Sequence, residues 1–131
     1  MAVARPKHLT LILAREFASS LATPMLIADE RGVLVFYNDA VAEIVGRPFA
    51  ETGEILLDGW MATFEPRALE PDPTGDERRP TQIAFQDRRA AHRRFRVISI
   101  DGVERQVALT AFPLFAHADE FVGIVAIFWR E

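Results

Sequence analysis

The chain carries few residues whose type and spacing could support covalent or metal chemistry. It contains three histidines, His8, His92 and His117, and no two of them have a spacing that would place both on one metal ion. It has no cysteine, which removes thiolate nucleophiles, zinc ribbons, iron–sulfur clusters, cysteinyl–flavin adducts and disulfides. The sequence therefore predicts no metal site.

The three serines offer no nucleophilic site either. Ser19, Ser20 and Ser99 lie outside any nucleophile-elbow context and have no evident His/Asp partner. The chain also has no GxG phosphate cradle. Asp29 and Asp101 fall in predicted turns, where short carboxylates accept hydrogen bonds from nearby backbone N–H groups. We predict that the chain is not an enzyme and holds no cofactor.

The one local concentration of charge is a run of arginines. It comprises Arg88, Arg89, Arg93, Arg94 and Arg96. Such a run could bind an anionic ligand or partner, but we interpret it as a solvated helix end and strand edge, whose charges oppose edge-to-edge association. The net charge of −4, from 15 basic and 19 acidic residues, gives no reason to expect nucleic acid as a partner.

An amphipathic helix over residues 8–21 is the first element that the pattern predicts. Its apolar residues recur at three- and four-residue steps: Leu9, Ile12, Leu13, Phe17 and Leu21. Pro24 and the residue before it end the helix. Arg15 and Glu16 interrupt the apolar stretch well before the length of a signal peptide or membrane span, so we expect a cytoplasmic protein with no membrane contact.

The remaining pattern predicts one α+β domain, because 131 residues, half of them apolar, leave room for one core. We expect strands at 25–28 and 33–37, a helix at 40–45, short helical turns between 49 and 79 with a mobile acidic loop at 70–77, a helix at about 81–91, and strands at 95–100, 107–115 and 121–129. This order favours a five-stranded antiparallel sheet with the small helices on one face.

Several segments of the chain resemble the PAS (Per-Arnt-Sim) sensor family. Residues 25–47, with Asp29 and Gly32 in the turn and Asn38 after the second strand, resemble the opening hairpin and first helix of that family. Residues 95–102, 111–114 and 121–128 resemble parts of its later strands, and the similarity runs from about residue 9 to 129. Another α+β sandwich of similar size is the alternative fold.

The resemblance implies a curved sheet that cups the small helices around an internal pocket, with an N-terminal flanking helix (1–22) outside a sensor domain (23–131). Together with strand alternation, it implies the following pocket-facing, ligand-binding positions: Leu26, Ala28, Leu34, Phe36, Phe95, Val97, Val107, Leu109, Ala111, Ile124, Ala126 and Phe128. All twelve are apolar, so the alternative is an ordinary filled core.

The resemblance also raises two cofactors that some family members bind. Haem-binding members use a histidine from the helix before the third strand; His92 lies three residues before Phe95, among arginines, and we interpret it as solvated. Flavin-binding members use a cysteine and late-strand amides, whereas Val97, Val107 and Phe128 stand at those amide positions here. We expect no photochemical flavin site; a flavin held without adduct chemistry stays open.

The sequence thus predicts a signal-sensing module that binds a small apolar or weakly polar ligand and relays through a homodimer formed by residues 8–21 or through an unidentified signalling partner. Two alternatives remain. One is a ligand-free protein–protein interaction or dimerisation module. The other is a small α+β enzyme, which would need a buried Asp or His in the pocket. We also expect Asn38 to bridge to the Asp29–Gly32 turn.

Overall fold

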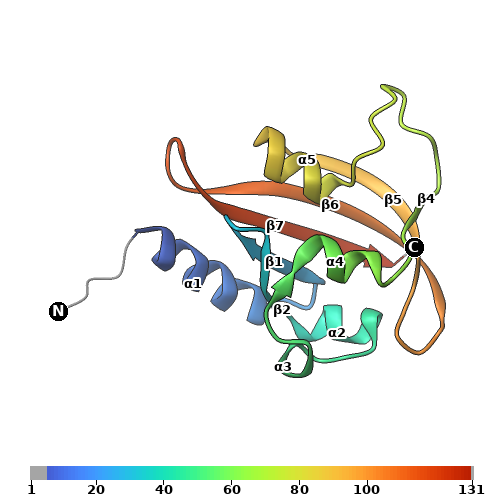
Figure 1. The fold of residues 1–131 in the computed structure, drawn as a ribbon. Coiled ribbons are helices and arrows are strands. Elements are labelled where there is room, and N and C mark those ends of the chain that lie inside the picture. Colours follow the sequence, from blue (N-terminus) through green and yellow to red (C-terminus); the bar gives the residue numbers. More distant parts are fainter. Residues whose placement is uncertain (1–5, 131) are drawn as a thin grey trace.

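The computed structural model describes residues 6–130, and side chains from Leu9 onward. The imidazole of His8 and residues 1–5 of the predicted N-terminal segment lie outside the described part. The elements in chain order are α1 (Pro6–Ser19), β1 (Met25–Asp29), β2 (Val33–Tyr37), α2 (Asp39–Val45), α3 (Phe49–Thr52), β3 (Ile55–Leu56), α4 (Leu57–Ala62), β4 (Arg67–Ala68), α5 (Pro80–Asp87), β5 (Ala91–Ile98), β6 (Glu104–His117) and β7 (Glu120–Arg130) (Figure 1). None of the described helices is long and apolar enough to cross a membrane.

The strands form one antiparallel sheet in the order β3-β2-β1-β7-β6-β5-β4. The first and last long strands are therefore neighbours, with Leu26 paired to Ala126. The predicted α+β class and the five main strands are confirmed. The predicted number of strands was too low: the sheet has seven within residues 6–130, because the two-residue strands β3 and β4 extend its two edges.

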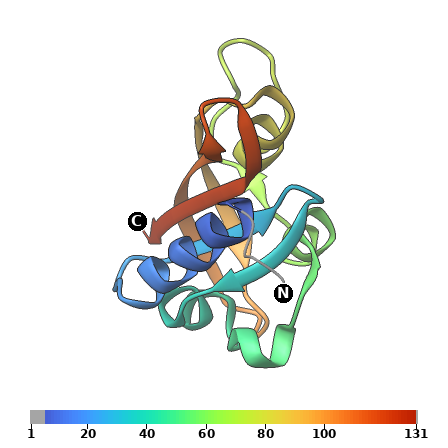
Figure 2. The ribbon, with the colours of Figure 1, turned by 90° about the vertical axis from the view of Figure 1, so that its left-hand side faces the viewer.

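The helices divide between the two faces of the sheet. Helix α1 lies across one face, and α2 to α5 lie on the other (Figure 2). The inner core, on the side of the small helices, contains Leu26, Ala28, Leu34, Tyr37, Val41, Ile44, Val45, Leu57, Trp60, Phe64, Ala84, Phe95, Val107, Leu109, Ala111, Ile124, Ala126 and Phe128. The outer cluster, beneath α1, contains Ala18, Met25, Ile27 and Val125, with Leu11, Ala14, Leu21, Val35, Phe36, Phe112, Leu114 and Ile127 packed against them.

Local chemistry explains where the helices begin and end. Asn38 caps α2 by accepting a hydrogen bond from the Val41 N–H, and Gly46 ends it in the left-handed conformation (φ 94°). Helix α5 ends at Asp87 because Arg88 adopts the left-handed conformation (φ 57°). The prediction of a helix through residue 91 was wrong, since Ala91 already pairs with β6 in the sheet.

One glycine sets the contact between β1 and β7. Gly123 has a φ of 153°, and a Cβ built there would lie 2.1 Å from the carbonyl oxygen of Ala28. A carbon cannot approach an oxygen that closely, so any side chain at this position forces the two strands apart. Because β1 and β7 form the middle of the sheet, this contact supports both of its faces.

Candidate functional site

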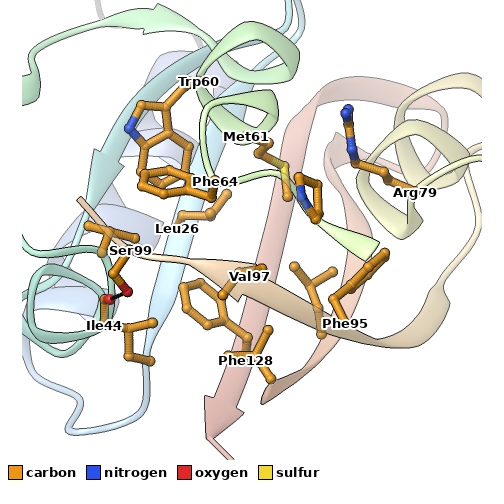
Figure 3. A pocket seen from close by; sticks show the side chains of 14 residues that line it. Leu26, Ile44, Trp60, Met61, Phe64, Arg79, Phe95, Val97, Ser99 and Phe128 are labelled. Atoms are coloured by element: carbon orange, nitrogen blue, oxygen red, sulfur yellow. Dashed lines mark hydrogen bonds between the residues drawn. The ribbon is translucent and has the colours of Figure 1, made fainter. Parts of the chain in front are cut away.

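An interior cavity of about 50 Å³ lies between the sheet and helices α2 and α4 (Figure 3). Its walls are almost entirely apolar. They are formed by Leu26, Ile44, Val45, Trp60, Met61, Phe64, Pro66, Arg79, Phe95, Val97, Ser99, Val107, Leu109 and Phe128. The volume exceeds the ~10–15 Å³ that one water molecule needs but is far below the roughly 300–1,000 Å³ of pockets for drug-sized ligands. In this conformation the cavity admits only a very small molecule.

The structure brings half of the twelve predicted pocket positions to the cavity wall: Leu26, Phe95, Val97, Val107, Leu109 and Phe128. Five others belong to the inner core without lining the cavity: Ala28, Leu34, Ala111, Ile124 and Ala126. Strand alternation is thus enough to place these eleven on the inner face. Their role in binding a ligand stays a prediction.

Phe36 is the exception, because it lies on the other face, against the outer cluster. The pairing of β1 with β2 changes register here: Ile27 is opposite Phe36, but Ala28 is opposite Leu34. Val35 is therefore an extra residue on β2, and a bulge of this kind reverses the alternation that follows it. The assignment of Phe36 to the pocket face was wrong for this reason.

Tyr37 takes the inward position that was assigned to Phe36. Its ring stacks on Trp60, with the ring centres 5.4 Å apart. Its hydroxyl lies 2.6 Å from the Arg47 carbonyl oxygen and 2.6 Å from Thr52 Oγ1, and burial raises the pKa of this hydroxyl. Helix α4 contributes Trp60, and Phe64 lies just after it; the two rings meet edge to face. The sequence showed these aromatic residues but no periodicity to orient them.

Ser99 and Arg79 are the hydroxyl and charged side chains on the cavity wall. Ser99 Oγ donates to the Ile44 carbonyl oxygen, which ties the end of α2 to the loop after β5 (Figure 3). Arg79 lies near Phe95 at one end of the cavity. Neither the Asp nor the His that an enzymatic site would require lines this cavity among the described residues.

His92 lies in β5 and not at the end of a helix. Its Nδ1 is 2.7 Å from Thr110 Oγ1, and its ring stacks on the Trp129 ring, with the ring centres 6.0 Å apart. It is exposed on the face opposite Phe95, so its ring points away from the cavity. His117 lies near Glu120 in the β6–β7 hairpin. Within residues 6–130, no three His, Cys, Asp or Glu side chains gather as a metal site.

The arginine run is divided among separate contacts. Arg88 covers the Phe121 ring, Arg89 pairs with Asp87, Arg94 with Glu70, and Arg96 with Glu104. The interpretation of the whole run as solvated was wrong for Arg93. Only 10% of its side chain is exposed, because residues before α5 fold over it.

Helix α1 has two apolar faces, whereas the sequence predicted one stripe. Leu11, Ala14, Ala18 and Leu21 pack on the sheet. The opposite residues form the exposed stripe of α1: Leu9, Ile12, Leu13 and Phe17, of which Phe17 is 60% exposed. Leu21 therefore belongs to the packed face, and the other four predicted residues face outward.

Asn38 connects the end of α1 to the interior. Its Nδ2 donates to the carbonyl oxygens of Ala18 (3.0 Å) and Thr23 (2.8 Å). Its Oδ1 accepts from the backbone N–H groups of Met25 and Val41, each at 3.2 Å. Asn38 is buried, and its bonds to Ala18, Met25 and Val41 are shielded from water.

The predicted bridge from Asn38 to the Asp29–Gly32 turn was therefore wrong in its partner. Asp29 satisfies that turn by itself: its Oδ1 accepts from the N–H groups of Arg31 (2.9 Å) and Val33 (3.2 Å). Its Oδ2 accepts from the Arg31 guanidinium, and this contact raises the pKa of Arg31.

The sheet order, the small helices on one face and the flanking helix on the other define a PAS-type fold, which confirms the predicted resemblance at the level of the fold. The match to the PAS domain of Bordetella pertussis BvgS covers 92% of this chain and 84% of that domain, with a TM-score of 0.62 at 16% identity. The match to the Rhodobacter sphaeroides LOV protein covers 93% of this chain and 67% of that protein, with a TM-score of 0.71 at 11% identity. The match to the PAS domain of nitrogen regulation protein NR(II) from Vibrio parahaemolyticus covers 91% of this chain and 98% of that domain, with a TM-score of 0.63 at 12% identity.

No family model and no curated protein matches the chain in sequence. The likeness is therefore carried by the arrangement of the elements in space, at identities that show the fold alone.

Proposed function

We propose that this protein is a sensory PAS module that works as a homodimer and relays changes in its core through α1. The observation that carries the proposal is the exposed stripe of α1. Four large apolar side chains face solvent on a helix whose opposite face is already buried. Contiguous exposed apolar residues of this kind are typical of interaction sites.

A second copy of the chain is the occupant that we propose for this stripe. Two antiparallel copies of α1 related by a twofold axis would bury the same residues on both sides, which a self-complementary interface requires.

Asn38 supplies the route by which the interior could influence this interface. It is bonded to the last turn of α1, to the start of β1 and to the start of α2. Helix α2 in turn contributes Ile44 and Val45 to the cavity wall. A shift of α2 on ligand binding would therefore change the hydrogen bonds that hold α1.

Single charge substitutions in the exposed stripe test the dimer. We expect Ile12→Glu and Phe17→Glu to weaken association at least tenfold, because each buries a carboxylate in an apolar interface. Leu56→Glu is the matched control, since Leu56 is equally exposed but lies on β3. Light scattering or sedimentation of the full chain measures the effect. A wild-type monomer at all concentrations would refute the proposal.

Substitution is preferable to removing the helix, because α1 also covers the outer cluster. A chain that begins near Thr23 would expose Met25, Ile27 and Val125. Its association would then report a newly exposed core and not the loss of the stripe.

A ligand-free interaction module is the second candidate, and the small interior cavity favours it. At about 50 Å³, the inner core is nearly filled. Native mass spectrometry of the purified protein separates the two functions: a retained small molecule supports the sensor. A dimer without retained mass, together with no thermal shift from any small organic compound, favours the interaction module.

A further inference from the structure

Arg93 has an unusual environment for a buried arginine. Its Nε is the one buried side-chain nitrogen or oxygen without a hydrogen-bond partner in the described part of the chain. Its Nη atoms make only long contacts: to the carbonyl oxygens of Asp76 (3.5 Å) and Glu70 (3.4 Å), and to Glu77 Oε2 (3.5 Å). Buried guanidinium groups normally have strong partners, so this donor set is incomplete.

A surface hollow of about 280 Å³ lies beside Arg93. Arg79 lines the same hollow, and its carboxylate partner, Asp58, is 3.8 Å away. Gln82 also lines it; its Oε1 accepts from the Arg79 N–H at 2.9 Å, which leaves its amide nitrogen as a further donor. The hollow thus has two guanidinium groups against a single acidic side chain, Glu77, on its walls.

The hollow adjoins the interior cavity. Pro66, Arg79 and Phe95 line both spaces, so these side chains form the wall between them. Figure 3 shows Arg79 and Phe95 together at one end of the cavity. An amphipathic ligand could therefore place a charged head in the hollow and an apolar tail toward the cavity.

We propose that this hollow binds a small organic monocarboxylate, with its carboxylate on Arg93 and Arg79 and a short aliphatic tail directed past Phe95. The Nε and one Nη of a guanidinium present two parallel N–H groups, which match the two oxygens of a carboxylate. An aromatic tail would not fit, because a cavity that holds benzene has about 150 Å³. Binding would supply the stimulus of the sensor proposed above, and only this role rests on that proposal.

Glu77 acts as an internal competitor for the site. Its carboxylate is the nearest acidic group to the Arg93 guanidinium in the hollow, but it is largely exposed and its contact is long. A ligand carboxylate with closer geometry would displace it. Removal of the Glu77 charge should therefore strengthen binding.

Titration of the full-length protein with butyrate, followed by calorimetry and by the NMR signals of the arginine Nε–H groups, tests the site. We expect Arg93→Gln and Arg79→Gln each to weaken butyrate binding about tenfold or more, and Glu77→Gln to strengthen it severalfold. Arg96→Gln is the matched control, because Arg96 is an exposed arginine of the same strand and should have no effect.

Butyramide, acetate and inorganic phosphate separate the contributions of charge and tail. We expect butyramide not to bind, and acetate and phosphate to bind more weakly than butyrate. Equal binding of butyramide, or phosphate binding as tight as butyrate, would overturn the proposal, as would an unperturbed Arg93 Nε–H signal at saturating butyrate. If Arg93→Gln fails to fold, Arg93→Lys and the exposed Glu77→Gln still decide the result. The dimer measurement is independent, so failure of this site and failure of the relay give different outcomes.

Discussion

The two faces of the sheet use similar residues for different purposes. On the inner face, apolar side chains from the strands and from α2, α4 and α5 surround a nearly filled core. On the outer face, α1 buries one side of itself and leaves the exposed stripe in solvent. An isoleucine on the inner face therefore stabilises the fold of one chain, whereas an exposed isoleucine in the stripe contributes little to that fold.

Gly123→Ala should have the largest effect, because it changes the contact between β1 and β7, on which both faces of the sheet depend. We expect a loss of about 4 kcal/mol or more of unfolding free energy, since the new Cβ would require β1 and β7 to separate. Urea melts of both proteins measure the loss. Gly53→Ala is the control: Gly53 also has a positive φ (67°), but no atom lies within 4 Å of a Cβ built there. Similar losses for the two variants would show that backbone strain, and not the close approach, dominates.

A pair of identical substitutions then separates the two faces directly. Ile44→Ala removes a buried side chain of the inner core, so we expect a loss of about 3 kcal/mol. Ile12→Ala changes an exposed side chain, so we expect less than about 0.5 kcal/mol at concentrations where the protein is a monomer, together with weaker association. Denaturant melts below and above the dimer midpoint measure both. Equal losses in the dilute protein would remove the distinction between the faces.

Asn38 tests the link between the faces. We expect Asn38→Ala to cost about 2–3 kcal/mol, because buried carbonyl and N–H groups lose their partner. Asn38→Asp keeps the oxygen that caps α2 but loses the donor to the Ala18 carbonyl oxygen at the end of α1. If the link transmits between α1 and the core, the Asp variant should alter the dimer affinity more than Ile44→Ala does. Unchanged association in both would limit Asn38 to a capping role.

The smallest effect concerns the acidic loop over α5. Hydrogen bonds from Arg78 lower the pKa of Asp76 to about 2, and the same guanidinium lowers the pKa of Asp87. Because these folded-state pKa values lie below the unfolded value of about 3.9, the contacts stabilise the fold above pH ~4 and are lost as the pH falls toward 2. The stability difference between the wild type and Arg78→Gln should shrink over that range. A constant difference would show that the charges of Asp76 and Asp87 do not contribute to the stabilising effect of Arg78.

The sequence determined most of the element order and most of the inner face. Period-two alternation predicted the orientation of eleven of the twelve pocket positions, because an unbroken strand places alternate residues on one face. It failed at Phe36, where the β1–β2 bulge inserts Val35. A bulge depends on the pairing with the neighbouring strand, so the sequence of β2 alone could not show it. Two Asn38 partners were missed for a related reason: Ala18, in the last turn of α1, and Thr23, in the loop after α1, lie 20 and 15 residues earlier in the sequence.

By itself, then, the sequence determined a PAS-like α+β domain with an amphipathic N-terminal helix, because periodicity and turn chemistry are local properties. Only the tertiary structure decided which side of α1 remains exposed, how little space the core encloses, and that Arg93 is buried beside Arg79. These features depend on segments distant in sequence that pack against one another: the sheet selects the buried side of α1, and the chain before α5 folds over β5. The local pattern of β5 showed only an arginine among other charges, whereas the fold gave that arginine an incomplete set of partners.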